Sequence, residues 1–133
     1  MNKKYKILIV DDDKLLLDMY SVKFNQQGFD VVIGIGGEDA LAKLRDGLNP
    51  DVILLDLVMP DVDGFDFFEI INREKLCENP IVIILTNQGQ ESDIKRAKEL
   101  GAAGYIVKAS ALPSEVLEQV MKIIEEKTGR INE

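Results

Sequence analysis

A short apolar run that ends at one carboxylate constrains the fold of this chain most. Residues 52–55 read Val-Ile-Leu-Leu, Asp56 follows, and Pro60 and Gly64 then direct the backbone into a loop. A continuous apolar run this short is typical of a strand buried on both faces, because a buried helix needs more length. In helix-covered parallel sheets, ligands bind outside the carboxyl ends of the strands. Asp56 therefore stands where functional residues are found, although a lone Asp at a strand end is most simply a turn residue.

The same pattern recurs along the chain. Further short apolar runs cover residues 5–10, 30–33, 81–85 and 104–107. After each run, apolar residues repeat at helical spacing, which predicts five helices. Their expected inward residues are Leu16, Met19, Tyr20 and Phe24; Ala40, Leu41 and Leu44; Phe68 and Ile71; Ile94 and Ala97; and Leu117, Val120, Met121 and Ile124. Strands that alternate with helices predict an α/β fold with a parallel sheet covered on both faces.

Glycine and proline indicate where these helices begin and end. Glycine suits the left-handed conformation that often follows a helix, and proline suits the first helical turn. The expected boundaries are Gly28, Gly47 and Gly101 as helix ends, about Phe65 to Pro80 for the third helix, Gln90 for the start of the fourth, and Pro113 for the start of the last.

Composition narrows the class of protein. A chain of 133 residues with 46% hydrophobic residues is long enough for one domain with its own core. A net charge of -8 argues against direct nucleic-acid binding, and the absence of His removes His-based catalysis and His metal sites. Neither a signal sequence nor a membrane span is evident, and Cys77, the one cysteine, has no disulfide partner within the chain. We expect a cytoplasmic protein without membrane contact.

Polar side chains of complementary chemistry follow four of the predicted strands. They are Asp11 and Asp12 after the first strand, Asp56 after the third, Thr86 after the fourth and Lys108 after the fifth. Carboxylates crowded together raise one another's pKa values and need a compensating cation. Mg²⁺ prefers oxygen ligands and shares its remaining positions with phosphate oxygens.

The remaining groups fit a phosphoryl group. The ammonium of Lys108 is a point charge suited to it, and the hydroxyl of Thr86 can donate a hydrogen bond to one of its oxygens. Asp carboxylates also act as nucleophiles that form an aspartyl phosphate. The set predicts Mg²⁺-dependent transfer of a phosphoryl group onto the protein.

From about Lys4 to Ile124, the chain resembles the response-regulator receiver domain of two-component signalling. The resemblance rests on four motifs: Ile-Val-Asp-Asp ending at Asp12, Leu-Asp-Leu-Val-Met-Pro-Asp-Val-Asp-Gly ending at Gly64, Ile-Leu-Thr ending at Thr86, and Gly-Tyr-Ile-Val-Lys ending at Lys108. It implies a flavodoxin-like doubly wound sheet with strand order 2-1-3-4-5 and five helices. We expect a receiver domain over residues 1–127 and a short tail over 128–133.

The resemblance also implies a role for each site residue. It makes Asp56 the phosphoacceptor, gives Mg²⁺ to Asp11, Asp12, Asp56 and the backbone carbonyl of Val58, and gives the phosphoryl contacts to Thr86 and Lys108. Tyr105 would be the aromatic residue whose rotamer follows Thr86. The expected protein is a signalling receiver, not an enzyme, that assists its own phosphorylation and dephosphorylation.

The resemblance implies two kinds of partner, a phosphoryl donor and a downstream protein. A histidine kinase or histidine phosphotransfer protein would donate the group, since this chain has no His of its own. With no output domain expected on this chain, a downstream protein would bind at the fourth helix, fifth strand and fifth helix. Lys95, Arg96 and Lys98 lie there, although a solvated helix face is their simplest interpretation.

The sequence departs from the family pattern around the site. Ala109 follows Lys108 where the family usually has a cis proline, and a cis bond before Ala would be costly, so we expect a less constrained Lys108. Asn87 is larger than the usual residue after Thr86. Val58 and Gln88 occupy places that resemble the family's tuning positions for hydrolysis. Because Val58 is apolar, we expect slow to moderate self-dephosphorylation.

Two other functions fit part of the pattern. In a haloacid-dehalogenase-type phosphatase, Asp11 would be the nucleophile and Asp13 the acid/base, but Leu15 does not match that motif and Asp56 would have no role. The second of these functions is that of an unphosphorylated scaffold with the receiver fold.

Several acids have a structural interpretation instead. Asp13 is better explained as a helix cap. Asp61 and Asp63 are expected to shape their loop, because Met59 and Ile70 occupy the first and last ligand positions of a calcium loop.

Overall fold

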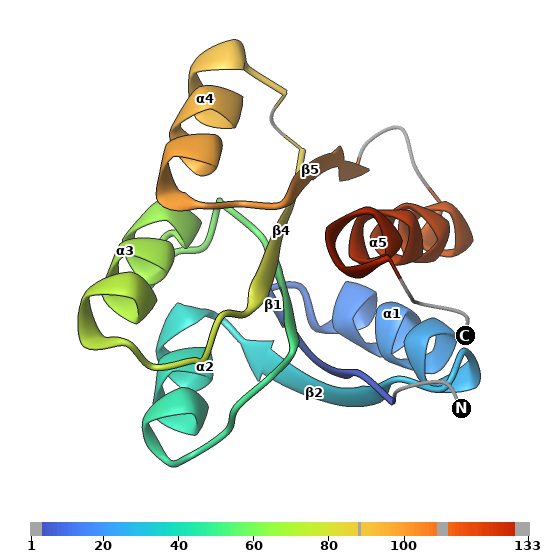
Figure 1. Ribbon diagram of the computed structural model, residues 1–133. Helices are drawn as coiled ribbons and strands as arrows, with labels where there is room; N and C mark the ends of the chain where they lie inside the picture. The colour runs from blue at the N-terminus through green and yellow to red at the C-terminus, as the bar shows by residue number, and fades with distance from the viewer. Residues whose placement is uncertain (1–3, 88, 109–111, 130–133) are drawn as a thin grey trace.

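A computed structural model of the chain describes residues 4–87, 89–108 and 112–129. Strands and helices alternate through these residues (Figure 1). The elements in chain order are β1 (Lys6–Asp11), α1 (Lys14–Gln26), β2 (Asp30–Ile35), α2 (Gly37–Arg45), β3 (Val52–Leu55), α3 (Gly64–Glu74), β4 (Ile81–Thr86), α4 (Glu91–Leu100), β5 (Gly104–Val107) and α5 (Pro113–Thr128). This confirms the predicted alternation.

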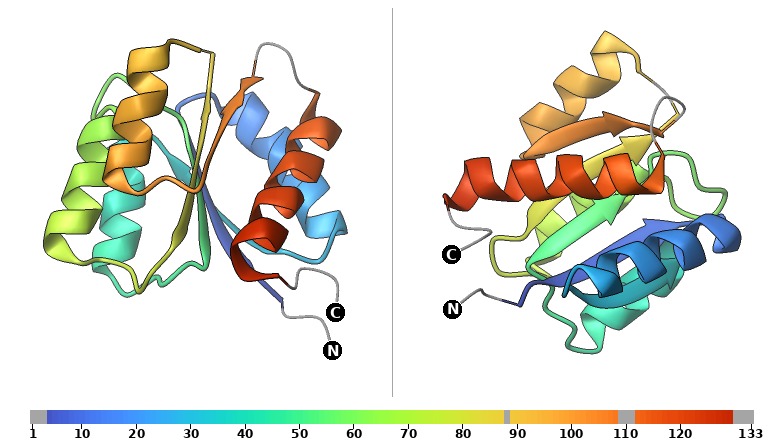
Figure 2. Two further views of the ribbon diagram at one scale, coloured as in Figure 1. Left: turned by 45° about the horizontal axis from the view of Figure 1, so that its top comes forward. Right: turned by 90° about the vertical axis from the view of Figure 1, so that its right-hand side faces the viewer.

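The five strands form one parallel sheet in the order β2-β1-β3-β4-β5, as the resemblance implied. Helices α1 and α5 cover one face, and α2, α3 and α4 cover the other (Figure 2). Side chains of a strand point alternately to the two faces. In β1, Ile7 and Ile9 pack with α1 and α5, while Leu8 and Val10 pack on the opposite side. Both faces are buried, which explains why the strands are apolar without alternation.

The buried face of α1 differs from the prediction. Leu17, Tyr20 and Phe24 are buried, whereas Met19, which we expected to face inward, is 42% exposed. The side chain of Asp13 accepts a hydrogen bond from the backbone N–H of Leu16 and so caps the helix. The inward stripe runs at spacings of three and four residues from Leu17, and this places Met19 toward solvent.

Helix α5 differs in one buried residue and in its end. Val116 is fully buried, although it was missing from the predicted stripe, and Leu117 and Met121 are only half-buried. Thr128, which we assigned to the tail, is the last residue of α5, and its hydroxyl donates to the backbone carbonyl of Ile124 over 2.8 Å. The start at Pro113 is confirmed.

Other boundaries shift by a few residues. The strand β2 continues to Ile35 because Gly34 and Ile35 pair with Val10 and Asp11 of β1. Helix α3 ends at Glu74, well before Pro80, because Lys75 adopts the left-handed conformation. Helix α4 begins at Glu91, one residue later than predicted. None of these shifts moves a site residue away from the carboxyl edge of the sheet.

Candidate functional site

The predicted site residues lie at the carboxyl edge of the sheet. Asp11 ends β1 and Thr86 ends β4, while Asp56 directly follows β3 and Lys108 directly follows β5. The backbone N–H of Asp56 donates to the carbonyl of Val10 over 3.0 Å, which holds the ends of β1 and β3 side by side. Parallel pairing therefore gathers residues that are distant in sequence.

Three carboxylates meet at this edge. Asp11, Asp12 and Asp56 each offer a carboxylate oxygen, and these oxygens lie within 4.8 Å of one another. Asp11 and Asp56 are buried, and Asp12 is exposed. Oδ1 of Asp11 also accepts a hydrogen bond of 3.0 Å from the backbone N–H of Asp13. The cluster thus has two buried acids at its base and one toward solvent.

Lys108 bridges the two buried acids. Its Nζ donates to Oδ2 of Asp11 over 2.7 Å and lies 3.7 Å from Oδ2 of Asp56. Burial, the largest single influence, lowers the pKa of Lys108, but the hydrogen bond to Asp11 and the two carboxylate charges outweigh it, and the pKa is raised. Lys108 is therefore a permanent positive charge beside Asp56.

The environment of Asp56 disfavours its charge. Burial and the neighbouring charge of Asp11 raise the pKa of Asp56 from 3.8 to about 6, against the opposing effects of Lys108 and of a hydrogen bond from the backbone N–H of Val58. Crowded carboxylates of this kind are stabilised by a bound cation. The all-oxygen donor set fits a hard ion such as Mg²⁺, which binds through one or two carboxylates and retains waters.

The two predicted switch residues lie on neighbouring strands. Thr86 is fully buried at the end of β4, and Tyr105 is half-buried on β5, where it packs with the α2–α3–α4 side of the core. Burial raises the pKa of Tyr105, and the charge of Asp93 on α4 adds to this effect. Tyr105 pairs with Ile84, two residues before Thr86 in β4, so the two switch residues lie close in the sheet.

The residues that depart from the family pattern are only partly described. Asn87 is exposed directly after Thr86, and Val58 is 55% exposed in the loop after Asp56. Gln88 and Ala109 lie outside the described residues, as does the peptide bond that joins Lys108 to Ala109.

Each of three further acids accepts hydrogen bonds at a helix amino terminus. Asp13 caps α1, Asp63 caps α3 through the N–H of Asp66, and Asp61 accepts from two N–H groups of α2. Asp13 is thus a cap, as predicted. No sequence pattern indicated that Asp61 reaches α2, because the contact spans 24 residues.

Tyr20 also lies near the acidic cluster, although its helical spacing indicates only a core residue. It is buried on α1, and burial raises its pKa, while the charge of Lys108 lowers it and those of Asp11 and Asp56 raise it. Tyr20 is therefore close enough to Lys108 and the acidic cluster for their charges to act on it. Helical spacing identified Tyr20 as buried but not what its hydroxyl faces.

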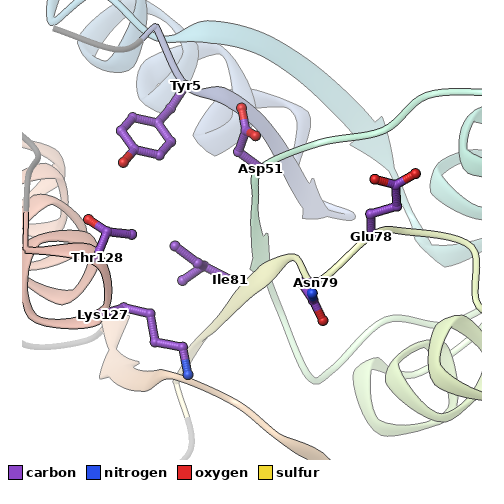
Figure 3. A pocket seen from close by; sticks show the side chains of 7 residues that line it. All are labelled: Tyr5, Asp51, Glu78, Asn79, Ile81, Lys127 and Thr128. Carbon is purple, nitrogen blue, oxygen red and sulfur yellow. The ribbon is translucent and has the colours of Figure 1, made fainter.

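A hollow of about 460 Å³ lies at the opposite, amino edge of the sheet (Figure 3). It is lined by Tyr5, Asp51, Glu78, Asn79, Ile81, Lys127 and Thr128. The carboxylate of Asp51 accepts a hydrogen bond from the backbone N–H of Lys6 over 2.9 Å and so ties the starts of β1 and β3 together. The length of the sheet separates this hollow from Asp56, so it is not part of the candidate site.

No helix within the described residues is long and apolar enough to span a membrane.

Two curated relatives are transcriptional regulators by name. The chain is 34% identical over 124 residues to the alkaline phosphatase synthesis transcriptional regulatory protein PhoP of Bacillus subtilis, covering 93% of this chain and 49% of PhoP. It is 34% identical over 121 residues to the DNA-binding dual master transcriptional regulator RpaA of Synechocystis, covering 89% of this chain and 47% of RpaA. The chain therefore spans about half the length of these relatives.

Solved structures of similar fold include chemotaxis protein CheY4 of Vibrio cholerae, with a TM-score of 0.81, 27% identity and coverage of 91% of this chain and 99% of CheY4. The response regulator DrrB of Thermotoga maritima gives a TM-score of 0.78 at 30% identity, over 94% of this chain and 54% of DrrB. The family model of the response regulator receiver domain matches residues 7–121. By its fold, its relatives and this match, the chain belongs to the response regulator receiver domains of two-component signalling.

Proposed function

We propose that this receiver domain accepts a phosphoryl group on Asp56, in a Mg²⁺-dependent reaction, from a histidine kinase or histidine phosphotransfer protein. The observation that carries the proposal is the placement of Asp56 between an acidic cluster and a lysine. Its carboxylate lies within 4.8 Å of those of Asp11 and Asp12, and 3.7 Å from the ammonium of Lys108. Transfer of a phosphoryl group needs this combination of nucleophile and surrounding positive charge.

The residues that would hold Mg²⁺ are Asp11, Asp12, Asp56 and the backbone carbonyl of Val58. A divalent ion, when bound, neutralises charge that builds on the transferring phosphoryl group. The raised pKa of Asp56 supports the proposal, because burial and then the charge of Asp11 disfavour its ionised form, which a bound cation would stabilise. Asp12 is exposed and suits a ligand that contacts the ion directly or through water.

The chemical step is a displacement at phosphorus. One carboxylate oxygen of Asp56 forms a bond to phosphorus while the bond from phosphorus to the donor's imidazole nitrogen breaks, and the leaving imidazole keeps that electron pair. Lys108 would exchange its contact with Asp11 for the phosphoryl oxygens, and the hydroxyl of Thr86 would donate to another of them. The ammonium, already 3.7 Å from Asp56, needs little movement for this.

The phosphorylated state would then act through Thr86 and Tyr105. Movement of Thr86 toward the phosphoryl group vacates space at the end of β4, and Tyr105 turns inward to fill it. The surface of α4, β5 and α5 would change, and a downstream protein would bind there. In this proposal the protein assists its own phosphorylation and dephosphorylation but has no separate substrate.

The test is labelling with acetyl phosphate, with and without Mg²⁺, read by intact mass and mapped to a residue. We expect one base-labile adduct on Asp56 that requires Mg²⁺ and is absent from Asp56→Asn. Label on Asp11 would instead favour the phosphatase, and no adduct on a folded, Mg²⁺-bound protein would favour an unphosphorylated scaffold.

The lifetime of that adduct is a separate prediction. The apolar, half-exposed Val58 offers no group to orient an attacking water, so we expect slow to moderate loss of the phosphoryl group. Intact mass followed over time after removal of acetyl phosphate measures it. A lifetime of seconds, rather than minutes or longer, would contradict this expectation.

A further inference from the structure

The loop that follows Asp56 is fastened to a helix that is remote in sequence. The carboxylate of Asp61 accepts hydrogen bonds from the backbone N–H of Gly37 over 3.2 Å and of Glu38 over 3.0 Å. These are the first two residues of α2. The N-cap residue of α2, Gly36, has no side chain to satisfy them. Asp61 therefore supplies, from another loop, the acceptor that an N-cap side chain ordinarily provides, and its charge suits a helix amino terminus.

The two glycines make this contact possible. Gly36 has a positive φ of 88°, and a Cβ there would lie 2.9 Å from Oδ2 of Asp61. A Cβ on Gly37 would lie 2.7 Å from Cβ of Val62 and 2.8 Å from its carbonyl oxygen. Any larger residue at Gly37 would therefore push the loop away. The loop and the start of α2 fit together closely because both positions lack side chains.

The same glycine turn is attached to the acidic cluster. The backbone N–H of Gly36 donates to the carbonyl of Asp11 over 2.9 Å. The N–H of Asp56 donates to the carbonyl of Val10, and the N–H of Gly64 closes the loop on the carbonyl of Leu57 over 2.8 Å. Val58 thus lies between two residues that are held in place: Asp56, at the end of β3, and Asp61, which is hydrogen-bonded to the start of α2.

The charged carboxylate of Asp61 binds the amino terminus of α2 and is not one of the converging acids of the cluster. Hydrogen bonds from the backbone, that of Glu38 first, lower the pKa of Asp61, so it is ionised at neutral pH. In the described residues, the group of acids whose oxygens converge consists of Asp11, Asp12 and Asp56, without Asp61. Asp61 therefore does not belong to the cluster and contacts the start of α2 instead.

We infer that Asp61 is a positioning residue: by docking on the start of α2, it holds the loop so that the Val58 carbonyl faces the carboxylates of Asp11 and Asp56. This inference rests on the proposed function, because it assigns the Val58 carbonyl to the cation. Residues that orient metal ligands from outside commonly change affinity by about 10- to 100-fold when they are lost.

The experiment compares Mg²⁺ affinity, by calorimetry on unphosphorylated protein, in the wild type, Asp61→Ala, Asp61→Asn and Gly37→Ala. We expect about tenfold weaker binding in Asp61→Ala. Asp61→Asn should restore affinity to within about threefold, because Asn is as good an N-cap as Asp. Gly37→Ala should also weaken binding, although Ala favours a helix more than Gly, because its Cβ displaces the loop at Val62.

The matched control is Arg45→Met. It removes the two hydrogen bonds that Arg45 of α2 donates to Glu74 of α3, and it leaves the hydrogen bonds of Asp61 to α2 in place. It should bind Mg²⁺ as the wild type does. Wild-type affinity in folded Asp61→Ala and Gly37→Ala would overturn the inference and leave Asp61 as a cap only. If Asp61→Ala does not fold, Gly37→Ala decides alone. Absence of Mg²⁺ binding in the wild type itself would refute the proposed function instead.

Discussion

The charge of Asp56 is costly in the folded protein when no cation is present. Burial and Asp11 raise its pKa to about 6, whereas an Asp in an unfolded chain titrates near 4. The folded state therefore holds the proton of Asp56 more strongly than the unfolded state does. This linkage makes the metal-free protein lose stability as pH rises from about 4 to about 6.

Asp56→Asn should remove that loss. Without metal, we expect the variant to exceed the wild type in free energy of unfolding by roughly 1–3 kcal/mol above pH 7, with the difference shrinking as pH falls toward 4. Urea unfolding at several pH values in EDTA measures both proteins. A difference that is the same at pH 4.5 and pH 7.5 would show that ionisation of Asp56 is not the cause.

At the scale of single elements, α1 separates a buried from an exposed apolar face. Leu17 is fully buried, and Met19, two residues later, is 42% exposed. We expect Leu17→Ala to lower the free energy of unfolding by about 2–5 kcal/mol and Met19→Ala to change it by less than about 0.5 kcal/mol. Urea unfolding tests both, and similar losses in the two variants would contradict the buried face described for α1.

Helix α4 buries few apolar side chains and also makes polar contacts to α3. Its one fully buried residue is Ala97, and the guanidinium of Arg96 lies 4.3 Å from the ring centre of Phe65 and 3.4 Å from Glu69 on α3. An element with little buried apolar surface opens locally at low cost. Such a helix would suit the surface that changes in the proposed function.

Arg96→Ala should loosen α4 without unfolding the core. We expect amide hydrogen exchange in α4 to become several-fold faster, because an exposed cation–π contact contributes about 0.5–1 kcal/mol. Exchange in α1, which covers the opposite face of the sheet, serves as the internal control. Unchanged exchange in α4 would show that Arg96 does not hold it.

At the scale of the whole molecule, binding of Mg²⁺ at the acidic cluster, as proposed, would couple cation binding to folding. A ligand that binds only the folded state stabilises it by about 2.7 kcal/mol at one hundred times its dissociation constant. At a Mg²⁺ concentration one hundred times the dissociation constant and at pH 8, we expect the free energy of unfolding to rise by about 2.7 kcal/mol. EDTA should reverse this gain. The gain should be smaller in Asp56→Asn, which lacks one charged ligand, and an equal gain would place the ion elsewhere.

The amino-acid sequence was sufficient to predict the architecture. Short apolar runs such as Val52–Leu55 must be buried on both faces, and their alternation with amphipathic helices leaves a parallel sheet as the consistent solution. Parallel strands end at one edge, so the order of elements along the chain was enough to group Asp11, Asp56, Thr86 and Lys108. These inferences succeed because burial and strand direction are local properties of the chain.

The contacts between these elements depend on how the elements pack in three dimensions. Packing buried Leu17 of α1 and left Met19 exposed, since the facing helix and sheet determine which of two apolar faces is covered. It placed the ammonium of Lys108 2.7 Å from Asp11 and docked Asp61 on the amino terminus of α2. The first contact joins residues that are 97 positions apart in the sequence, and the second joins residues that are 23 positions apart. Sequence periodicity does not indicate such contacts, because the packing of whole elements brings the side chains together.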